Sequence, residues 1–318
     1  MANENLKQAK KEKKYEFYTQ LTDIEKELKY YKDEFKGKTI FCNCDDPEWS
    51  NFWKYFELNF DHLGIKKLIS THYEDNKPSY KLEIIGDITG DGKVDHKDII
   101  KTPLKQNGDF RSPEAIEILK EADIVITNPP FGLFREYLSQ LDEYGKDFII
   151  IGNTNALTYK ETFKLFKEDK IRTGYTNFNV GMFFFVPDSY EKYTKIVDGR
   201  KMVRVSTSCW FTSLPVKKHN DKLICYKKYS KEEYPNYENY DAINVSTYTD
   251  IPMDYDGVMG VPVTFLDKYN PEQFELLGMA SSAGYNKDIV GIDFKGIKDA
   301  RPTINGKTLF ARIFIKKR

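Results

Sequence analysis

The chain has 318 residues, of which 40% are hydrophobic and 31% are charged, and its 49 lysines and arginines equal its 49 aspartates and glutamates. These values are ordinary for a globular protein, and the length allows one large domain and a smaller one. No apolar run approaches the ~20 residues of a membrane span. The lysine-rich start at residues 1–14 lacks the apolar centre of a secretory signal, so we expect a cytoplasmic protein.

The first part of the chain predicts helices alternating with strands. Thr22 and Glu25 form a capping-box pair ahead of an apolar-periodic run at 24–35, which predicts a helix ended by Gly37. The elements expected next are a strand at 39–44, a turn at 45–47, a helix at about 49–60 closed by Gly64, and a strand at 67–71.

Residues 80–100 form an excursion with turn signals. Five of its residues fit the oxygen-ligand and glycine positions of a calcium loop: Asp87, Thr89, Asp91, Gly92 and Asp98. The preceding segment, 80–85, alternates like a strand, whereas a calcium loop of this kind lies between two helices. We therefore interpret the glycine-rich stretch as a hairpin turn. The four histidines are scattered, and the four cysteines suit buried thiols better than a zinc site, so we predict no metal.

The middle of the chain continues the alternation. Ser112 and Pro113 are typical of a helix start, and that helix runs to 122. The elements expected next are strands at 123–127 and 148–151, a helix at 133–144 between them, and strands at 181–186 and 202–214. Continuous apolar strands between helices predict an α/β fold, with a doubly wound, mostly parallel sheet.

After about residue 215 the pattern changes to short, polar, Tyr-rich segments broken by prolines. We therefore expect two domains. Residues 1–214 form the main one, and residues 215–318 form a smaller region whose end returns to the main domain.

The strongest motif is Asn128-Pro129-Pro130-Phe131, directly after the strand at 123–127. Ligands of open α/β sheets bind at the carboxyl ends of strands, where this turn lies. The Asn128 side-chain oxygen and the Pro129 carbonyl together offer two acceptors for the hydrogens of an amino group, and Phe131 offers a ring for stacking on a base. This arrangement suits alignment of an adenine amine for methylation, with no covalent nucleophile.

The sequence resembles the EcoRI-type adenine-specific DNA methyltransferases, and the resemblance spans most of the chain. It is carried by segments 16–20, 42–47, 50–52, 108–112, 123–131, 209–212, 260–262 and 267–274. It implies a Rossmann-like domain that binds S-adenosylmethionine, and a C-terminal region that recognises DNA. The implied cofactor-binding residues are Tyr18, Thr19, Asn43, Cys44, Asp45, Asp46, Asp109 and Phe110. Catalysis is implied for Asn128 to Phe131, and packing near the target base for Phe131, Trp210 and Phe211.

The sequence departs from the general methyltransferase pattern in the first cofactor loop. Most such loops are rich in glycine, but here the loop reads Asp46-Pro47-Glu48-Trp49-Ser50. Glycines permit close approach of the backbone to a ligand, so the contacts of this loop cannot be copied from the general pattern. Glu74 is the nearest candidate for the acidic residue that usually holds the ribose.

The resemblance implies a site-specific enzyme that flips an adenine out of double-stranded DNA. We expect Lys217, Lys218 and Lys222 to contact phosphates, and the protein to be a monomer. A cognate restriction endonuclease acting on the same site, without a stable complex, would be its partner unless the enzyme is a solitary relative. Two alternatives stay open: an RNA or protein-glutamine methyltransferase with the same loop, and a non-catalytic DNA-binding module on a methyltransferase scaffold.

Overall fold

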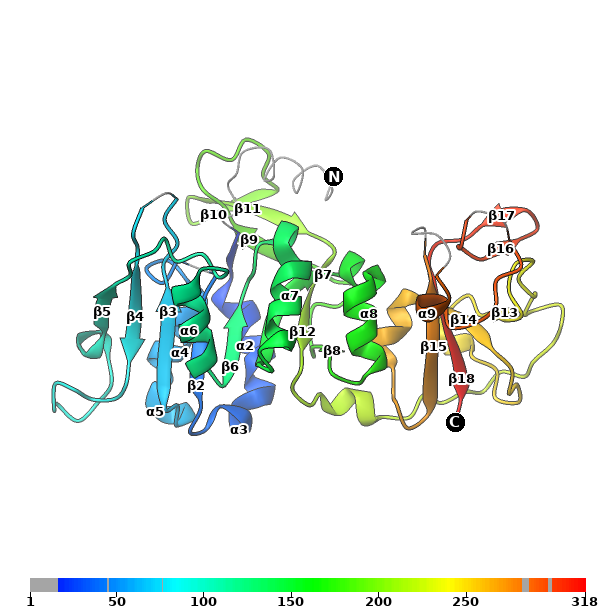
Figure 1. Cartoon of the computed structure of the whole chain (residues 1–318), viewed down its shortest axis with the longest axis horizontal. Coiled ribbons are helices and arrows are strands. Elements are labelled where there is room, and N and C mark those ends of the chain that lie inside the picture. The colour runs from blue at the N-terminus through cyan, green and yellow to red at the C-terminus, as the bar shows by residue number, and fades with distance from the viewer. Residues whose placement is uncertain (1–16, 45, 76, 282–285, 297–298) are drawn as a thin grey trace. The chain divides into compact units, whose positions relative to one another are not determined.

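The computed structural model describes residues 17–44, 46–75, 77–281, 286–296 and 299–318. It divides into two compact units (Figure 1). Unit 1 comprises residues 1–154 and 174–214, and unit 2 comprises 155–173 and 215–318. Residues 155–173 precede the expected boundary at 214/215 and yet group with the second unit. Within the described ranges, the structure contains no helix of a length and apolarity suited to crossing a bilayer.

A mixed β-sheet forms the centre of unit 1. The strands that unit 1 contributes to it lie in the order β5 (Ile100–Pro103), β4 (Tyr80–Ile84), β3 (Lys67–Thr71), β2 (Thr39–Cys42), β6 (Ile124–Thr127), β7 (Asp147–Asn153) and β12 (Ser208–Thr212). The four strands β3, β2, β6 and β7 are parallel, while β4, β5 and β12 pair antiparallel. The prediction of a mostly parallel sheet therefore holds for the centre and is wrong for the edges.

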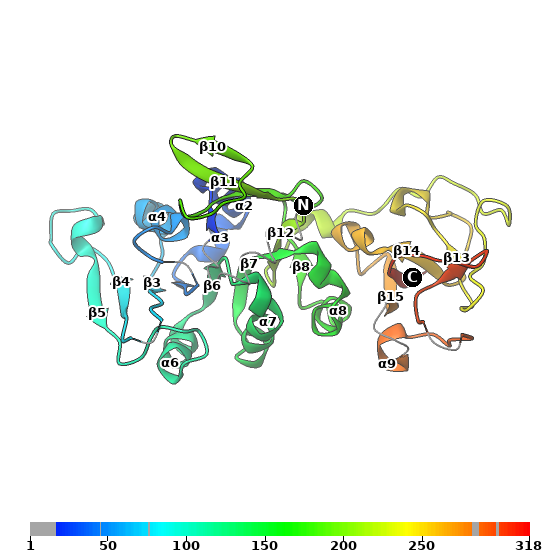
Figure 2. The same ribbon diagram turned by 90° about the horizontal axis from the view of Figure 1, so that it is seen from above.

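Helices cover both faces of this sheet (Figure 2). On one side lie α2 (Leu21–Leu28), α3 (Lys32–Phe35) and α4 (Asn51–Leu58), followed by α5 (Phe60–Leu63); on the other lie α6 (Pro113–Glu121) and α7 (Phe134–Glu143). Short 3₁₀ turns are η1 (Lys29–Tyr31), η2 (His96–Asp98) and η3 (Phe131–Leu133). The side chains that face the sheet are apolar, and the continuous strands β2 and β6 are buried throughout, as a sheet covered on both faces requires.

Several predicted helix ends are confirmed by their caps. Ser112 accepts a hydrogen bond from Ala115 N at the start of α6, and Gly64 ends α5 at φ +61°. The Thr22–Glu25 capping box is wrong. The helix begins at Leu21, and the carbonyl of Gln20 accepts from the amides of Asp23 and Ile24, with no side-chain cap.

A second, smaller sheet in unit 1 has the order β1 (Tyr18–Thr19), β9 (Met182–Phe185), β11 (Arg200–Val205) and β10 (Lys195–Val197). Its pairs are antiparallel. The single strand expected at 202–214 is therefore wrong. A turn at Ser206–Thr207 divides it into β11 of the small sheet and β12 of the large one.

The excursion at 85–99 connects the antiparallel strands β4 and β5, which confirms the hairpin and excludes the helix–loop–helix of a calcium loop. Asp87 accepts hydrogen bonds from the amides of Gly90 and Gly92, and Asp98 accepts from those of Ile88, Thr89 and Asp95. These carboxylates hold the loop together. In the described part of the chain, no group of three or more His, Cys, Asp or Glu side chains is arranged to hold a metal ion.

Unit 2 is built on a sheet in the order β13 (Ile243–Asn244), β14 (Met259–Pro262), β18 (Arg312–Lys317) and β15 (Phe274–Ala280). Its other elements are β8 (Arg172–Thr173), the β16 (Thr303–Ile304) and β17 (Lys307–Thr308) hairpin, α8 (Lys160–Lys167), α9 (Lys287–Val290), η5 (Lys217–Asn220), η6 (Tyr248–Asp250) and η7 (Val263–Lys268). The 3₁₀ turn η4 (Thr154–Thr158) begins where the chain enters this unit.

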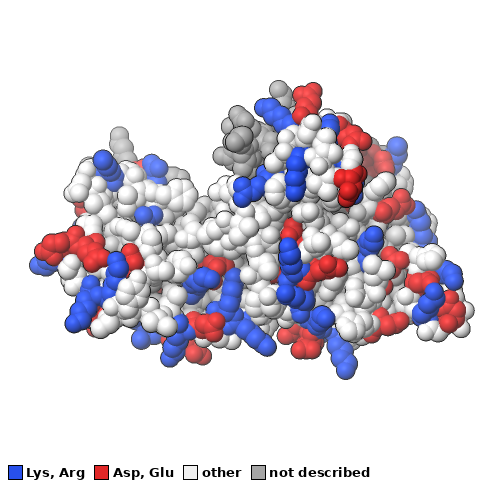
Figure 3. Space-filling view, turned by 180° about the vertical axis from the view of Figure 1, so that it is seen from behind, with Lys and Arg blue, Asp and Glu red and all other residues white. Residues whose placement is uncertain are grey.

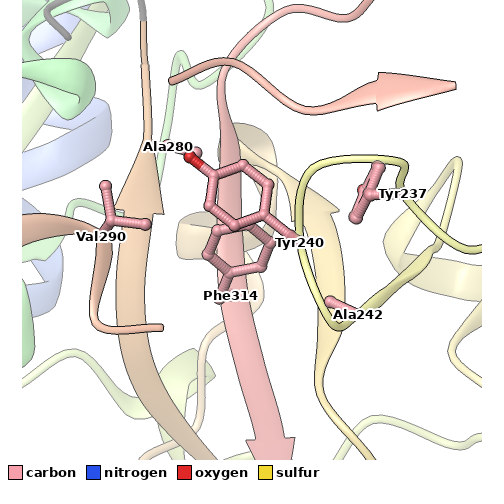
Figure 4. Close-up of a cluster of buried hydrophobic side chains, with 6 residues drawn as sticks. All are labelled: Tyr237, Tyr240, Ala242, Ala280, Val290 and Phe314. Atoms are coloured by element: carbon pink, nitrogen blue, oxygen red, sulfur yellow. The ribbon is translucent and has the colours of Figure 1, made fainter. Parts of the chain in front are cut away.

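A buried aromatic cluster lies on the sheet of unit 2 (Figure 4). The rings of Tyr240 and Phe314 are 4.8 Å apart between centroids, and the Tyr240 hydroxyl donates to the carbonyl of Ala300. Tyr237 donates to Asn244 Oδ1 at 2.9 Å and to the carbonyl of Gly260 at 3.1 Å. These hydroxyls have partners, so the tyrosines stabilise the interior of the polar C-terminal region.

Candidate active site

The carboxyl ends of the parallel strands carry most of the predicted cofactor and catalytic residues. Asn43 and Cys44 follow β2, and Asn128 follows β6, its neighbour in the sheet. The amide of Cys44 donates to Thr127 Oγ1 at 3.2 Å, which joins the two loops directly. The small sheet is tied to the same edge, because Asn51 Nδ2 at the start of α4 donates to the carbonyl of Thr19 at 2.6 Å.

Asn128 is held in one orientation by the N-terminal segment. Its side-chain amide donates to the carbonyl of Phe17 at 2.7 Å, and only 7% of the residue is exposed. A carbonyl accepts but cannot donate, so the amide nitrogen must face Phe17. The other atom, Asn128 Oδ1, is buried and has no hydrogen-bond partner among the described residues. Buried acceptors are rarely left unpaired, and one in a loop at a strand end points to a ligand.

Phe131 belongs to an aromatic cluster that includes the same N-terminal segment. Its ring centroid lies 6.0 Å from that of Phe17 and 6.1 Å from that of Phe184 in β9. Pro129 is buried, while Pro130 and Phe131 are partly exposed. The predicted catalytic loop is therefore anchored by packing on one side and reaches the surface at its aromatic end.

The first cofactor loop has its own hydrogen-bond network. The buried hydroxyl of Tyr137 in α7 donates to Asn43 Oδ1, which the Cys44 thiol also approaches at 3.6 Å. Asn43 Nδ2 is buried and has no partner within the described residues, and the same is true of Thr19 Oγ1.

At the end of this loop, where most methyltransferases have glycine, Ser50 caps a helix. The Ser50 hydroxyl accepts from the amides of Phe52 and Trp53 and so starts α4. The Asp46 carbonyl accepts from the amides of Trp49 and Ser50, and Asp46 Oδ2 lies 3.6 Å from His72 Nε2. Asp45 lies outside the described residues.

The loop that carries Asp109 and Phe110 packs closely on the end of β3. Gly108 has φ +79°, and a Cβ there would lie 1.9 Å from the carbonyl oxygen of His72. The amide of Glu74 donates to the carbonyl of Asn107 at 2.9 Å, which brings the predicted ribose ligand beside this loop. The Glu74 carboxylate is 42% exposed and lies 3.8 Å from Lys77 Nζ.

Asp109 and Phe110 have different surroundings. Arg111 donates to both carboxylate oxygens of Asp109, at 2.8 and 2.7 Å, which holds the pKa of that carboxyl below its usual value. Phe110 is 5% exposed, and its ring meets that of Tyr137 edge-on at 5.0 Å. A cavity of about 280 Å³ adjoins Phe110, between α6 and α7.

Trp210 and Phe211 lie in the core of unit 1, fully buried in β12. The Trp210 indole donates to Asn177 Oδ1 at 3.2 Å and packs edge-on against Phe52. Phe211 packs against Phe134 at 5.3 Å between centroids. Neither ring is exposed to solvent. Direct contact with a target base would therefore be made by the side chains that cover these rings, and Trp210 and Phe211 would support those side chains.

The three predicted phosphate-binding lysines lie in unit 2 and differ from one another. Lys218 Nζ forms an ion pair with Asp267 Oδ1 at 2.6 Å, and both side chains are largely buried. Lys217 and Lys222 are exposed. A buried pair holds its charge against its partner, so Lys218 is better suited to stabilising unit 2 than to binding a phosphate.

Charge is interspersed rather than segregated. On the face drawn in Figure 3, basic and acidic side chains alternate over the surface. A DNA contact on this face would therefore use a local group of lysines, as expected for a chain whose formal net charge is zero.

The sequence motifs missed two residues of the site, Asn51 and Tyr137. Asn51 lies in a segment that carries the resemblance, but the resemblance implies no role for it. Tyr137 shares the buried face of α7 with Phe134, Leu138 and Leu141, at helical spacing. A tyrosine on an apolar helix face needs a buried partner for its hydroxyl. The position of Tyr137 in this pattern is therefore the sequence signal that could have indicated a buried hydrogen bond.

The residues present fit S-adenosylmethionine. Among the buried side-chain polar atoms without a hydrogen-bond partner in the described part of unit 1, Thr19 Oγ1 and Asn43 Nδ2 belong to segments predicted for cofactor binding, and Asn128 Oδ1 belongs to the predicted catalytic loop. Asn43 offers a donor, and the Thr19 hydroxyl offers a donor or an acceptor. A ligand with an amino acid end and a nucleoside end has groups for donors and acceptors of this kind.

Comparisons with known proteins show the family of the chain. The family described as "Adenine-specific methyltransferase EcoRI" matches residues 5–318. The type II methyltransferase M.EcoRI of Escherichia coli is 44% identical over 333 residues, covering 99% of this chain and 97% of that protein. M.MgeORF184P of Mycoplasma genitalium and M.MpnI of Mycoplasma pneumoniae are each 39% identical, covering 97% and 98% of this chain and 97% of each relative. No solved structure matches the chain.

Proposed function

The chain belongs to the EcoRI family of adenine-specific DNA methyltransferases, and from that premise we propose that it methylates the exocyclic amine of an adenine flipped out of duplex DNA. Unit 1 is then the Rossmann-like domain that binds S-adenosylmethionine and carries out catalysis, and unit 2 is the DNA-recognition region. The predicted monomeric state and the predicted restriction endonuclease belong to the same proposal.

The unpaired oxygen of Asn128 is the observation that carries the chemistry. It accepts one hydrogen of the adenine amine, and the Pro129 carbonyl accepts the other. Two acceptors on the amine reduce the delocalisation of its lone pair into the ring, so the nitrogen is a better nucleophile. Phe131 stacks on the flipped base, a contact worth roughly 1–3 kcal/mol. As the bond from the amine nitrogen to the methyl carbon forms, the carbon–sulfur bond of the bound cofactor would break and leave a neutral thioether, and the amine would release one proton to solvent.

S-adenosylmethionine, when bound, supplies the methyl group as a sulfonium. Thr19 and Asn43 offer it hydrogen-bonding groups, and Phe110 lies in the segment assigned to its adenine. Tyr18, Cys44, Asp46 and Asp109 complete the proposed pocket, together with Asp45. Glu74 is proposed to hold the ribose, and Trp210 and Phe211 to support the side chains around the target base.

An extended segment of unit 2 supports the proposed DNA contact. Along residues 222–228, exposed and less exposed residues alternate, and the exposed ones are Lys222, Ile224, Tyr226 and Lys228. Ile224 is 87% exposed and Tyr226 is 65% exposed. Gln273 fixes the segment, because its side chain accepts from the amide of Leu223 at 2.7 Å and donates to the Leu223 carbonyl at 2.8 Å.

This exposed row has the chemistry of a DNA contact. Lys222 and Lys228 have no ion-pair partner among the residues described, whereas Lys227, on the other side of the segment, pairs with Glu233 and Asp250. Free lysines at both ends suit phosphates, and an apolar and an aromatic side chain between them suit a groove. Lys217, Lys222 and Lys228 are therefore the proposed phosphate contacts.

Methyl transfer from labelled cofactor to plasmid DNA, followed by mapping of the modified bases, tests the proposal. We expect N6-methyladenine at one short sequence. Asn128→Ala and Phe131→Ala should retain cofactor binding and cut turnover strongly, while Lys36→Gln, an exposed lysine far along the chain from the motif, should have no effect. Label appearing only on RNA or on protein glutamine would support the alternative transferases. DNA binding without label in any substrate would support the non-catalytic module.

A further inference from the structure

Tyr137 lies in α7, and no sequence motif gives it a role; the role inferred for it below rests on the proposed function. The helix α7 begins at Phe134, immediately after η3 and the catalytic loop. Tyr137 is fully buried in unit 1. It contacts two cofactor segments at once: its hydroxyl donates to Asn43, and its ring packs edge-on against Phe110.

The hydrogen bond fixes which way the Asn43 amide faces. Two donors, the Tyr137 hydroxyl and the Cys44 thiol, meet at Asn43 Oδ1. The amide is planar, so its nitrogen points away from both. That nitrogen has no hydrogen-bond partner in the described part of the structure. It is also shielded from solvent, because Asn43 is only 4% exposed.

Such an arrangement is costly unless a ligand completes it. An unpaired buried amide group lowers stability, and a flip of the Asn43 side chain would satisfy no more groups, because it would turn the oxygen away from two donors. The structure thus keeps one donor unpaired at the carboxyl end of β2, where α/β sheets bind ligands.

We propose that Tyr137 is a positioning residue for cofactor binding: it orients Asn43 so that the Asn43 amide nitrogen donates to an acceptor group of S-adenosylmethionine. Tyr137 touches neither the cofactor nor the target base. Burial raises the pKa of the Tyr137 phenol well above its usual value, so the hydroxyl stays a donor.

The test is a double-mutant cycle on cofactor binding, made in the full-length protein. Tyr137→Phe keeps the ring and its contact with Phe110 and removes only the hydroxyl. We expect the Kd for S-adenosylmethionine, measured by calorimetry, to rise about 10-fold, the effect of roughly one oriented hydrogen bond. The kcat at saturating cofactor should change less than about twofold, because the target amine is aligned by other residues.

The cycle distinguishes orientation from general stability. If Tyr137 acts through Asn43, Tyr137→Phe will have no further effect on Kd in an Asn43→Ala background. Tyr31→Phe is the matched control: Tyr31 is equally buried in unit 1 and donates to Glu27 Oε1 at 2.9 Å. It should lower the unfolding midpoint to a similar extent and leave the Kd unchanged.

Further variants keep the outcome decisive. Asn43→Asp retains the acceptor for Tyr137 but replaces the nitrogen with an oxygen, so it should also weaken cofactor binding. The proposal is overturned if Tyr137→Phe binds the cofactor as tightly as the unaltered chain, or if its effect is equal in both backgrounds. An unaltered chain that binds no S-adenosylmethionine at all would instead refute the proposed function.

Discussion

The side-chain amide of Asn128 donates to the backbone carbonyl of Phe17, 111 positions earlier in the chain, at 2.7 Å. This one contact decides which atom of the Asn128 amide is left without a partner, and that atom is Oδ1. In the proposed mechanism the N-terminal segment therefore acts on the chemistry although it contributes no reactive group.

Asn128→Asp should remove activity without unfolding the chain. A carboxylate oxygen would replace the nitrogen that faces the Phe17 carbonyl, so two acceptors would oppose each other. We expect kcat to fall about 100-fold or more, the order of effect seen when an aligned polar contact to the reacting group is lost. Single-turnover methyl transfer measures it, and Asn51→Asp tests whether any nearby substitution has the same effect. Retention of most of the activity would contradict the assigned role of the Phe17 contact.

Glu27 should stabilise unit 1 through four hydrogen bonds. Its carboxylate accepts from the Tyr31 hydroxyl, the amides of Tyr175 and Thr176, and the Thr176 hydroxyl, at 2.6–2.9 Å. Glu27→Gln places an NH₂ group against donors and should cost about 2 kcal/mol in the free energy of unfolding. Denaturant unfolding measures the loss, and Glu25→Gln, exposed on the same helix, should be neutral.

The same residue predicts a pH dependence. Burial raises the pKa of Glu27 above its ordinary value, since it disfavours the charged form. The folded state therefore holds this proton to a higher pH than the unfolded state does. Stability from this group is complete below the ordinary carboxyl pKa of 4.5 and declines as pH rises through the raised value. The advantage of the native residue over Glu27→Gln should shrink over that interval, and an advantage that grows instead would contradict the burial effect.

Gly108→Ala should impair cofactor binding as well as stability. The added Cβ would meet the carbonyl of His72 at 1.9 Å and force the Asp109–Phe110 loop away from β3. Gly90 is a matched control, since it has φ +75° and nothing within 4 Å of an added Cβ. Gly90→Ala should show only the backbone strain of about 1 kcal/mol, whereas Gly108→Ala should cost more and raise the Kd for S-adenosylmethionine. Equal effects of the two substitutions would show that the close approach to His72 is unimportant.

The lysines of unit 2 should separate into two classes. Lys222→Gln and Lys228→Gln should each reduce the slope of log K against log salt for DNA by about 0.9, since each phosphate contact contributes that amount. Lys218→Gln should leave the slope unchanged and lower stability, because Lys218 pairs with Asp267. Filter binding or fluorescence anisotropy at several salt concentrations measures the slopes.

The apolar part of the exposed row has its own test. Ile224→Ser and Tyr226→Ser should weaken DNA binding without altering the salt slope. Ile88→Ser, which removes an equally isolated side chain that is 53% exposed in unit 1, should not. Unchanged DNA affinity in both unit 2 variants would remove this segment from the proposed interface.

Local rules recovered the elements whose signals are local. The cap at Ser112, the left-handed Gly64 and the apolar runs at β2, β6 and β7 are encoded within a few residues. The same rules failed at Thr22, where the backbone of Gln20 caps the helix instead, and at 202–214. In residues 202–214 two strands are joined by one short turn but belong to different sheets. The sequence of this segment does not show which strands it will pair with.

The candidate site was predictable to the extent that it is carried by motifs. Family resemblance and strand-end position indicated Asn43, Phe110 and Asn128, and these lie in one hydrogen-bonded and packed region of unit 1. The orientation of each amide was not predictable, since it depends on Phe17 and Tyr137, which are distant in sequence. Lys218 was predicted to contact a phosphate because it lies in a basic stretch of the sequence. Its ion pair with Asp267 depends on the tertiary fold, which a basic stretch alone does not predict.

The course of the chain between the units also limits how the protein can be divided. Thr173 donates to Asp267 Oδ1 and Lys167 donates to the Leu277 carbonyl, so residues 155–173 depend on partners that come about 100 positions later. A chain cut at 214/215 would separate α8 and β8 from those partners. Two fragments expressed from that cut would therefore each be incomplete. Reassembly on mixing would require residues 155–173 of the first fragment to bind to the second.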